Sequence, residues 1–194
     1  MRDASTHEVS IALRRAGFYG QVEGGARFFA REFGAGQALV VGAASQQAPE
    51  QVEGEPVDVG IYSVQAPDPL LSLRFSSVQA LVDAVHTARH TSLSRRRGIA
   101  KDGAPSPLMS AFLVQAGFEI EDPVNDPRYL CTRESHWPAA ALLSAPDNGR
   151  PDVGLGKPVV LAILGAEEER PFLEIAFPTL LSFLRSVGVE AVGG

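Results

Sequence analysis

The chain has 194 residues, of which 45% are hydrophobic and 21% charged, and its formal net charge is −6. This composition is typical of a folded protein and argues against a disordered chain. The acidic balance gives no general attraction to phosphate backbones, so nucleic acid is not the expected partner. A length near 200 residues allows one large domain or two small ones.

The compartment is predicted from cysteine usage and from the N-terminal segment. The single cysteine, Cys131, cannot form an intramolecular disulfide, and no apolar segment follows the initial Met-Arg-Asp. No part of the chain approaches the roughly 18 consecutive apolar residues that a membrane-spanning helix needs. We therefore expect a soluble, cytoplasmic protein with no membrane partner.

The first half begins with an expected helix from Thr6 to Ala16. Ser5 and Glu8 form a capping-box pattern, apolar residues follow at helical spacing, and a glycine comes directly after. A Gly-rich link is predicted next. The segments Ala26 to Phe33 and Gln37 to Ala43 are short and apolar enough to be strands.

A hairpin and a second helix close the first half. Apolar and polar residues alternate from Val57 to Ile61 and again from Leu71 to Phe75, which predicts two half-buried strands joined by a turn. Ser76 or Ser77 is placed to cap a helix that begins near Val78. Residues 45–55 are a polar loop by composition.

The second half predicts the same order of elements. Ser106 can cap a helix with Pro107 at its first position. We expect Pro127 to Cys131 to be the counterpart of Ala26 to Ala30. We then expect, in chain order, a strand at 139–143, a polar loop at 145–157, two hairpin strands at 159–164 and 172–177, and a closing helix at 179–187. The strand at 159–164 is apolar enough to be covered on both faces.

Residues 56–85 and 158–187 match without an insertion, at a constant offset of 102 positions. The identical residues include two of the three prolines of each segment and are Pro56/Pro158, Val57/Val159, Ile61/Ile163, Pro69/Pro171, Leu71/Leu173, Phe75/Phe177 and Val85/Val187. Between them the apolar character is kept. This self-similarity indicates an internal duplication.

We therefore predict an α+β fold made by duplication of a unit of roughly 100 residues, each unit being a helix, an antiparallel sheet and a helix. The two similar lobes would be related by a pseudo-twofold axis. The first repeat is expected at 1–92 and the second at 106–194. A basic linker rich in Gly, Ser and Pro would join them at 93–105.

The linker carries the basic residues Arg95, Arg96, Arg97 and Lys101, which could contact nucleic acid or an acidic partner. The alternative is a solvated linker, because no aromatic residue lies among the basic ones. The chain's one tryptophan, Trp137, is either an interface anchor or a core residue.

Acidic residues cluster near the start of the second half, at Glu119, Glu121 and Asp122. Such a cluster could recognise a basic partner through complementary charge. Solvated loops are the alternative interpretation.

A metal site can be imagined from His86 and His90, which are four residues apart on a helix, together with Cys131 and His136. The chain has neither an H-E-x-x-H motif nor C-x-x-C pairs, so we predict no metal site. Cys131 and His136 could also form a nucleophile and base, but a small buried core residue explains Cys131 better. No motif predicts a cofactor.

The residues shared by the two repeats are apolar, Pro or Gly, and not of catalytic types. We therefore favour a non-enzymatic macromolecular interaction protein, an adaptor, regulator or inhibitor with a protein partner. One alternative is an enzyme or small-ligand-binding protein with a site between the lobes, built from His86, His90, Arg128, Arg133 and His136. A second alternative is a nucleic-acid accessory protein that uses the linker arginines.

Overall fold

A computed structural model describes residues 4–33, 36–51, 54–63, 68–90, 104–120, 128–131, 139–146, 149–165 and 171–191. The chain divides into two compact units, Met1–Val85 and His86–Gly194. This division falls within helix α2 (Val78–His90). The predicted linker lies outside the described residues up to position 103.

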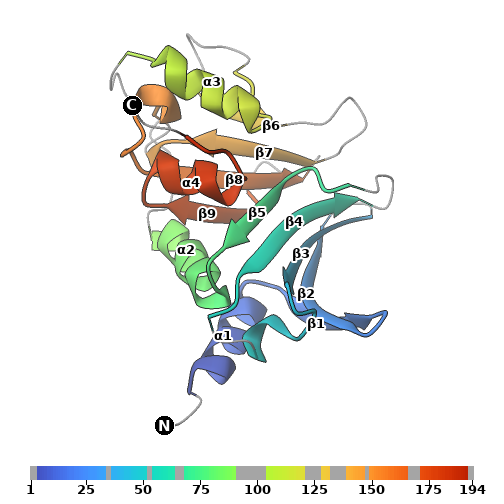
Figure 1. Ribbon diagram of the computed structural model, residues 1–194. Helices are drawn as coiled ribbons and strands as arrows, with labels where there is room; N and C mark the ends of the chain where they lie inside the picture. Colours follow the sequence, from blue (N-terminus) through green and yellow to red (C-terminus); the bar gives the residue numbers. More distant parts are fainter. Residues whose placement is uncertain are drawn as a thin grey trace. The chain divides into compact units, whose positions relative to one another are not determined.

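The first unit is built around a five-stranded antiparallel sheet whose strands follow one another in chain order (Figure 1). The strands of this sheet are β1 (Tyr19–Glu23), β2 (Ala26–Phe33), β3 (Gln37–Ala43), β4 (Val57–Ser63) and β5 (Ser72–Phe75). The unit also contains helix α1 (Ala4–Arg15) and the short helix η1 (Pro49–Gln51). Strands β2 and β3 have the predicted bounds. Helix α2 begins directly after Ser77, whose hydroxyl accepts a hydrogen bond from the backbone N–H of Ala80 at 3.2 Å.

Strand β1 lies where we predicted a link, so that prediction is wrong. The two glycines that suggested a link, Gly24 and Gly25, have positive φ angles of 58° and 87°. They form a two-residue turn between the paired residues Glu23 and Ala26. Two residues with positive φ are what a tight β-hairpin turn requires, and glycine adopts them without strain.

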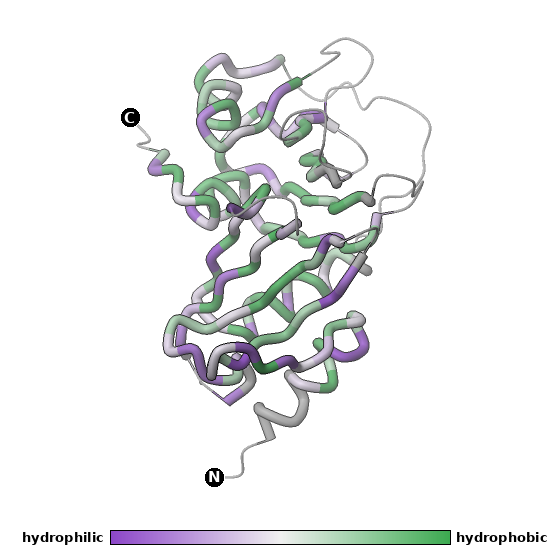
Figure 2. The backbone as a smooth tube through the Cα atoms, turned by 90° about the vertical axis from the view of Figure 1, so that its right-hand side faces the viewer, coloured by the Kyte–Doolittle hydropathy of each residue, from purple (hydrophilic) through white to green (hydrophobic). Residues whose placement is uncertain are grey.

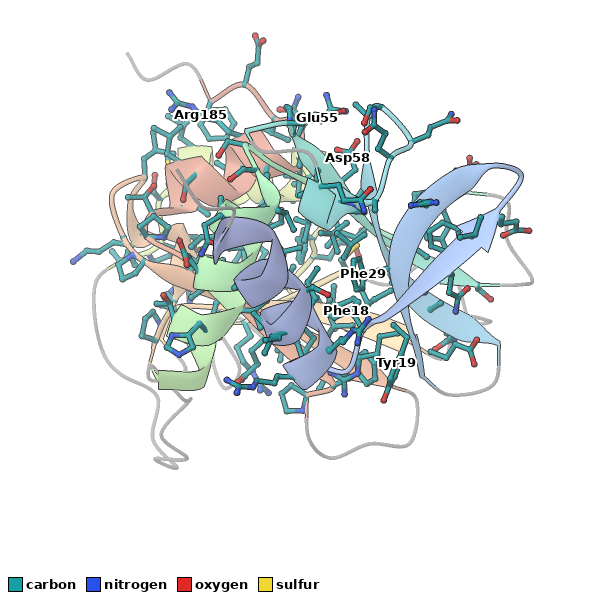
Figure 3. All side chains as sticks on the ribbon, turned by 90° about the horizontal axis from the view of Figure 1, so that it is seen from below. Phe18, Tyr19, Phe29, Glu55, Asp58 and Arg185 are labelled. Atoms are coloured by element: carbon teal, nitrogen blue, oxygen red, sulfur yellow. The ribbon has the colours of Figure 1, made fainter. Side chains whose placement is uncertain are left out.

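The core of the first unit lies on one face of its sheet. The buried residues Phe29, Val41, Val59 and Leu73 are paired in register across four neighbouring strands. Phe18, which follows α1, is buried as well, whereas the next residue, Tyr19, is exposed (Figure 3). Each large apolar side chain that is fully buried contributes about 1.5–3 kcal/mol to stability.

The second unit contains a four-stranded antiparallel sheet in the order β6-β7-β8-β9. Its elements are α3 (Pro107–Gln115), β6 (Tyr129–Cys131), β7 (Ala139–Ser144), η3 (Pro151–Val153), β8 (Val159–Gly165), β9 (Leu173–Phe177) and α4 (Leu180–Ser186). Helix α4 begins with a capping box between Thr179 and Ser182.

Strand β8 is the centre of the second core, because every residue from Val159 to Ile163 is buried. The prediction of cover on both faces is confirmed. The ring of Phe183 from α4 makes edge contacts with Phe118 and Phe177, with ring centroids 5.5 and 5.3 Å apart. Figure 2 shows hydrophobic residues running along the strands of both sheets.

Across the described ranges, none of the helices combines the length and the apolar character needed to cross a membrane.

Candidate functional site

A buried polar cluster joins three parts of the second unit. Ser110 comes from α3, Tyr129 from β6, and Arg150 and Asp152 from the segment that forms η3. These four residues are called the Asp152 cluster below. Asp152 is completely buried and Tyr129 almost so.

Local structure places each member of the cluster. Pro151 opens η3, where its missing N–H leaves no lost hydrogen bond. The backbone carbonyl of Asp152 accepts a hydrogen bond from the N–H of Ser106 at 2.9 Å, which joins η3 to the residue before α3. Tyr129 is paired with Leu143 in the sheet and shares its buried face.

The Asp152 carboxylate accepts hydrogen bonds at both oxygens. Arg150 donates from Nε to Oδ1 at 2.9 Å and from Nη2 to Oδ2 at 2.8 Å. The Tyr129 hydroxyl donates to Oδ2 at 2.9 Å, and the Ser110 hydroxyl lies 3.2 Å from the same oxygen. The two hydroxyl oxygens are 2.9 Å apart.

These contacts decide the charge of the cluster. Burial alone would raise the pKa of Asp152, but the hydrogen bonds from Arg150 and Tyr129 outweigh it and hold that pKa below its usual value. Burial raises the pKa of Tyr129, and the neighbouring Asp152 adds to this. At neutral pH, Asp152 is therefore an anion and Tyr129 is a neutral donor.

The cluster has the chemistry of a structural clamp. A carboxylate with a lowered pKa is a weak base, and Asp152 already accepts from three side chains of its own unit. Removing one partner of a buried ion pair is strongly destabilising, because the other charge is left uncompensated. The cluster therefore fixes α3 and β6 relative to η3.

The side of α3 opposite its buried residues Met109 and Leu113 is exposed. Pro107, Leu108, Ala111, Val114 and Gln115 are all exposed and define the α3 outer face. Leu108 is 52% exposed and Val114 58%. The helix contains no charged residue at all. At 100° per residue the five positions cover one continuous arc, in which only Gln115 is polar.

Of the partner-binding residues predicted from the sequence, the structure describes only Glu119. Its side chain is exposed, and its backbone exchanges two hydrogen bonds with Leu130, at 2.8 and 2.7 Å. The others lie outside the described residues: Arg95, Arg96, Arg97, Lys101, Glu121, Asp122 and Trp137.

The imagined metal and nucleophile residues are described only in part. His86 is exposed on α2, while His136 and the side chain of His90 lie outside what is described. Cys131 is buried in β6, as predicted, with its sulfur near the turn at Gly117. In the described part of the chain, no three His, Cys, Asp or Glu residues gather as metal ligands would.

Sequence reasoning missed the Asp152 cluster. Asp152 falls in the segment 145–157, which we predicted as a polar loop, and Tyr129 was treated as an ordinary strand residue. The signal was a tyrosine at a core position of a strand, because a buried tyrosine hydroxyl needs a hydrogen-bond partner.

Scans against protein-family models, curated proteins and solved structures each found no significant match to this chain.

Proposed function

We propose that this chain is a non-enzymatic interaction protein, an adaptor, regulator or inhibitor, built from two duplicated α+β lobes. Its binding surface is the α3 outer face, and its partner is a protein with an apolar pocket that receives Leu108 and Val114. The observation that carries the proposal is that α3 has exposed apolar residues where the corresponding helix α1 has charged ones.

The strand pairing supports the duplication. Val41 pairs with Val59 in the first unit, and Leu143 pairs with Leu161 in the second, at an offset of 102. All six residue pairs of β7 with β8 have counterparts at this offset. The four pairs of β4 with β5 likewise have counterparts between β8 and β9.

The turns after α1 and α3 support it as well, at an offset of 100. Phe18 N–H donates to the Leu13 carbonyl, and Phe118 N–H donates to the Leu113 carbonyl. The same offset relates the pair Tyr19–Ala30 to the bridge Glu119–Leu130. Under the proposed duplication, Leu130 and not Cys131 corresponds to Ala30, one residue away from our sequence alignment.

Given this correspondence, α3 differs from α1 mainly on its outer face. The positions of Pro107, Leu108, Ala111, Val114 and Gln115 are occupied in α1 by His7, Glu8, Ile11, Arg14 and Arg15. A lobe thus accepts charged residues at the positions of Leu108, Val114 and Gln115. Exposed Leu108 and Val114 are not needed for folding, and an exposed apolar surface of this kind favours a protein contact.

The Asp152 cluster supports the role of α3 in binding, because it holds the helix through the half-buried Ser110. A helix that is already ordered loses less conformational entropy when it binds. Covering the exposed parts of Leu108 and Val114 would contribute about 2 kcal/mol in total. The rest of the affinity must come from neighbouring contacts.

The test compares the tagged wild-type chain with a Leu108→Glu/Val114→Arg variant in affinity capture from a lysate of the native cells. The variant introduces the residues that α1 carries. We expect one stoichiometric protein to be retained by the wild type at high salt and lost with the variant. Arg14→Val on α1 is the matched control and should retain it. Equal capture by both forms would contradict the proposal.

A further inference from the structure

Strand β1 forms one edge of the five-stranded sheet, and every residue from Tyr19 to Glu23 is exposed. Tyr19 is 68% exposed and Val22 69%, the highest values among the large hydrophobic residues described. Natural edge strands are commonly protected against pairing by charged side chains, especially lysine, by proline or by a bulge. Glu23, at the end of β1, is the one charged residue of this strand. The sequence Tyr-Gly-Gln-Val-Glu has neither lysine nor proline, and its pairing with β2 has no bulge.

The backbone groups that face outward from this edge can be identified. Arg27 N–H donates to the Gln46 carbonyl, so it points toward the β3 side of β2. Arg27 and the residue opposite it in β1, Val22, therefore form a non-hydrogen-bonded pair. Because the pattern alternates, the N–H and C=O groups of Gly20 and Val22 point away from the sheet. Within the described ranges no other backbone group pairs with them, so they can bind a further antiparallel strand.

We propose that this edge binds the same edge of a second copy of the chain, joining the two sheets through an antiparallel β1–β1 pair. The pair is centred on Gln21, which lies opposite Gln21 of the second copy. Gly20 is then opposite Val22, and Tyr19 is opposite Glu23. The outward-facing groups of Gly20 and Val22 form the hydrogen-bonded pairs of this register.

Charge and shape favour a second copy as the occupant. In this register no two like charges are directly opposed, and like charges opposed across strands are destabilising. A Cβ atom built on Gly20 meets no atom within 4 Å, so the position beside it is open. The exposed Val22 of the second copy would lie next to that open position, and the Tyr19 ring would cover the methylene groups of Glu23.

The sharpest test is a charge exchange at Gln21, followed by sedimentation velocity of the full chain over a range of concentrations. Wild type should form a dimer. Gln21→Lys alone and Gln21→Glu alone should each raise the dimer Kd by about threefold to fivefold, because each opposes two like charges. An equal mixture of the two variants should restore dimerisation to the wild-type level or above it.

Val22→Pro removes an outward-facing N–H and should also weaken the dimer, whereas Val22→Thr keeps that donor and should not. Circular dichroism checks that each variant is folded. A wild-type chain that is monomeric at every concentration would overturn the proposal. So would a dimer whose Kd is the same in Gln21→Lys, Gln21→Glu and their mixture. A dimer lost only with Leu108→Glu/Val114→Arg would place the interface at α3 and also reject the β1 edge.

Discussion

Arg150 holds Asp152 through two parallel hydrogen bonds, at 2.9 and 2.8 Å, inside the second unit. Arg74 holds Asp58 with the same geometry, at 2.8 and 2.9 Å, across β4 and β5 at the surface of the first unit. The two pairs differ in solvent exposure, and Asp152 also accepts hydrogen bonds from Tyr129 and Ser110. They therefore give a matched comparison of one interaction in two environments.

The first prediction concerns stability. Asp152→Asn should lower the free energy of unfolding of the second unit by about 3–5 kcal/mol, because it leaves the Arg150 guanidinium without its buried counter-charge. Asp58→Asn is the control, and it should have a much smaller effect because water screens the exposed pair. Urea unfolding followed by circular dichroism measures both. Equal effects of the two substitutions would show that Asp152 is not a clamp.

The second prediction concerns acid pH. The pKa of Asp152 is lower in the folded chain than in the unfolded chain. Its contribution is therefore fully present above the unfolded-state pKa of about 3.9, and it is lost as pH falls through the folded-state value. The stability difference between wild type and Asp152→Asn should thus be constant near neutral pH and shrink in acid. A difference that grows as the pH falls would contradict this assignment.

The third prediction concerns Glu174, whose ionisation lowers stability, whereas that of Asp152 raises it. Burial raises its pKa, so its charge is unfavourable in the folded state at neutral pH and protonation relieves that cost. We expect Glu174→Gln to be more stable than wild type at neutral pH and to lose stability more steeply in acid. Thermal unfolding over a pH series tests this. A variant with the wild-type pH profile would show that Glu174 has no part in acid stability.

A buried glutamine offers a stabilising change. Gln37 is 2% exposed, and among the residues described neither its Nε2 nor its Oε1 has a hydrogen-bond partner. Leaving a buried polar group unpaired costs about 1–3 kcal/mol. Gln37→Met should therefore raise the melting temperature, while Gln51→Met at an exposed position should not. A destabilised Gln37→Met would mean that the amide has a partner of its own, such as bound water.

Most strands and helices followed from the sequence, because their signals are local. The bounds of β2 and β3 were predicted from apolar residues alone, and the alternation at Val57 to Ile61 located β4. Strand β1 was missed because an edge strand exposed along its length has no buried face, and so no hydrophobic alternation. Its glycines then suggested a link.

The candidate site was harder to predict, because its members are far apart in the chain. Tyr129 and Asp152 are separated by 23 residues, and Ser110 and Asp152 by 42. No local pattern indicates that η3 will bring a carboxylate under α3. The α3 outer face could be recognised only after the structure separated the buried side of the helix from its exposed side.

The proposed function depends most directly on whether the α3 outer face contacts a protein. A photo-crosslinking amino acid placed at position 108 of the full chain tests this in the native cells, with position 14 on α1 as the matched exposed site. We predict one specific crosslinked protein at position 108, which is absent at position 14 and disappears when Val114→Arg is added. No specific product at position 108, or the same products at both positions, would contradict the account.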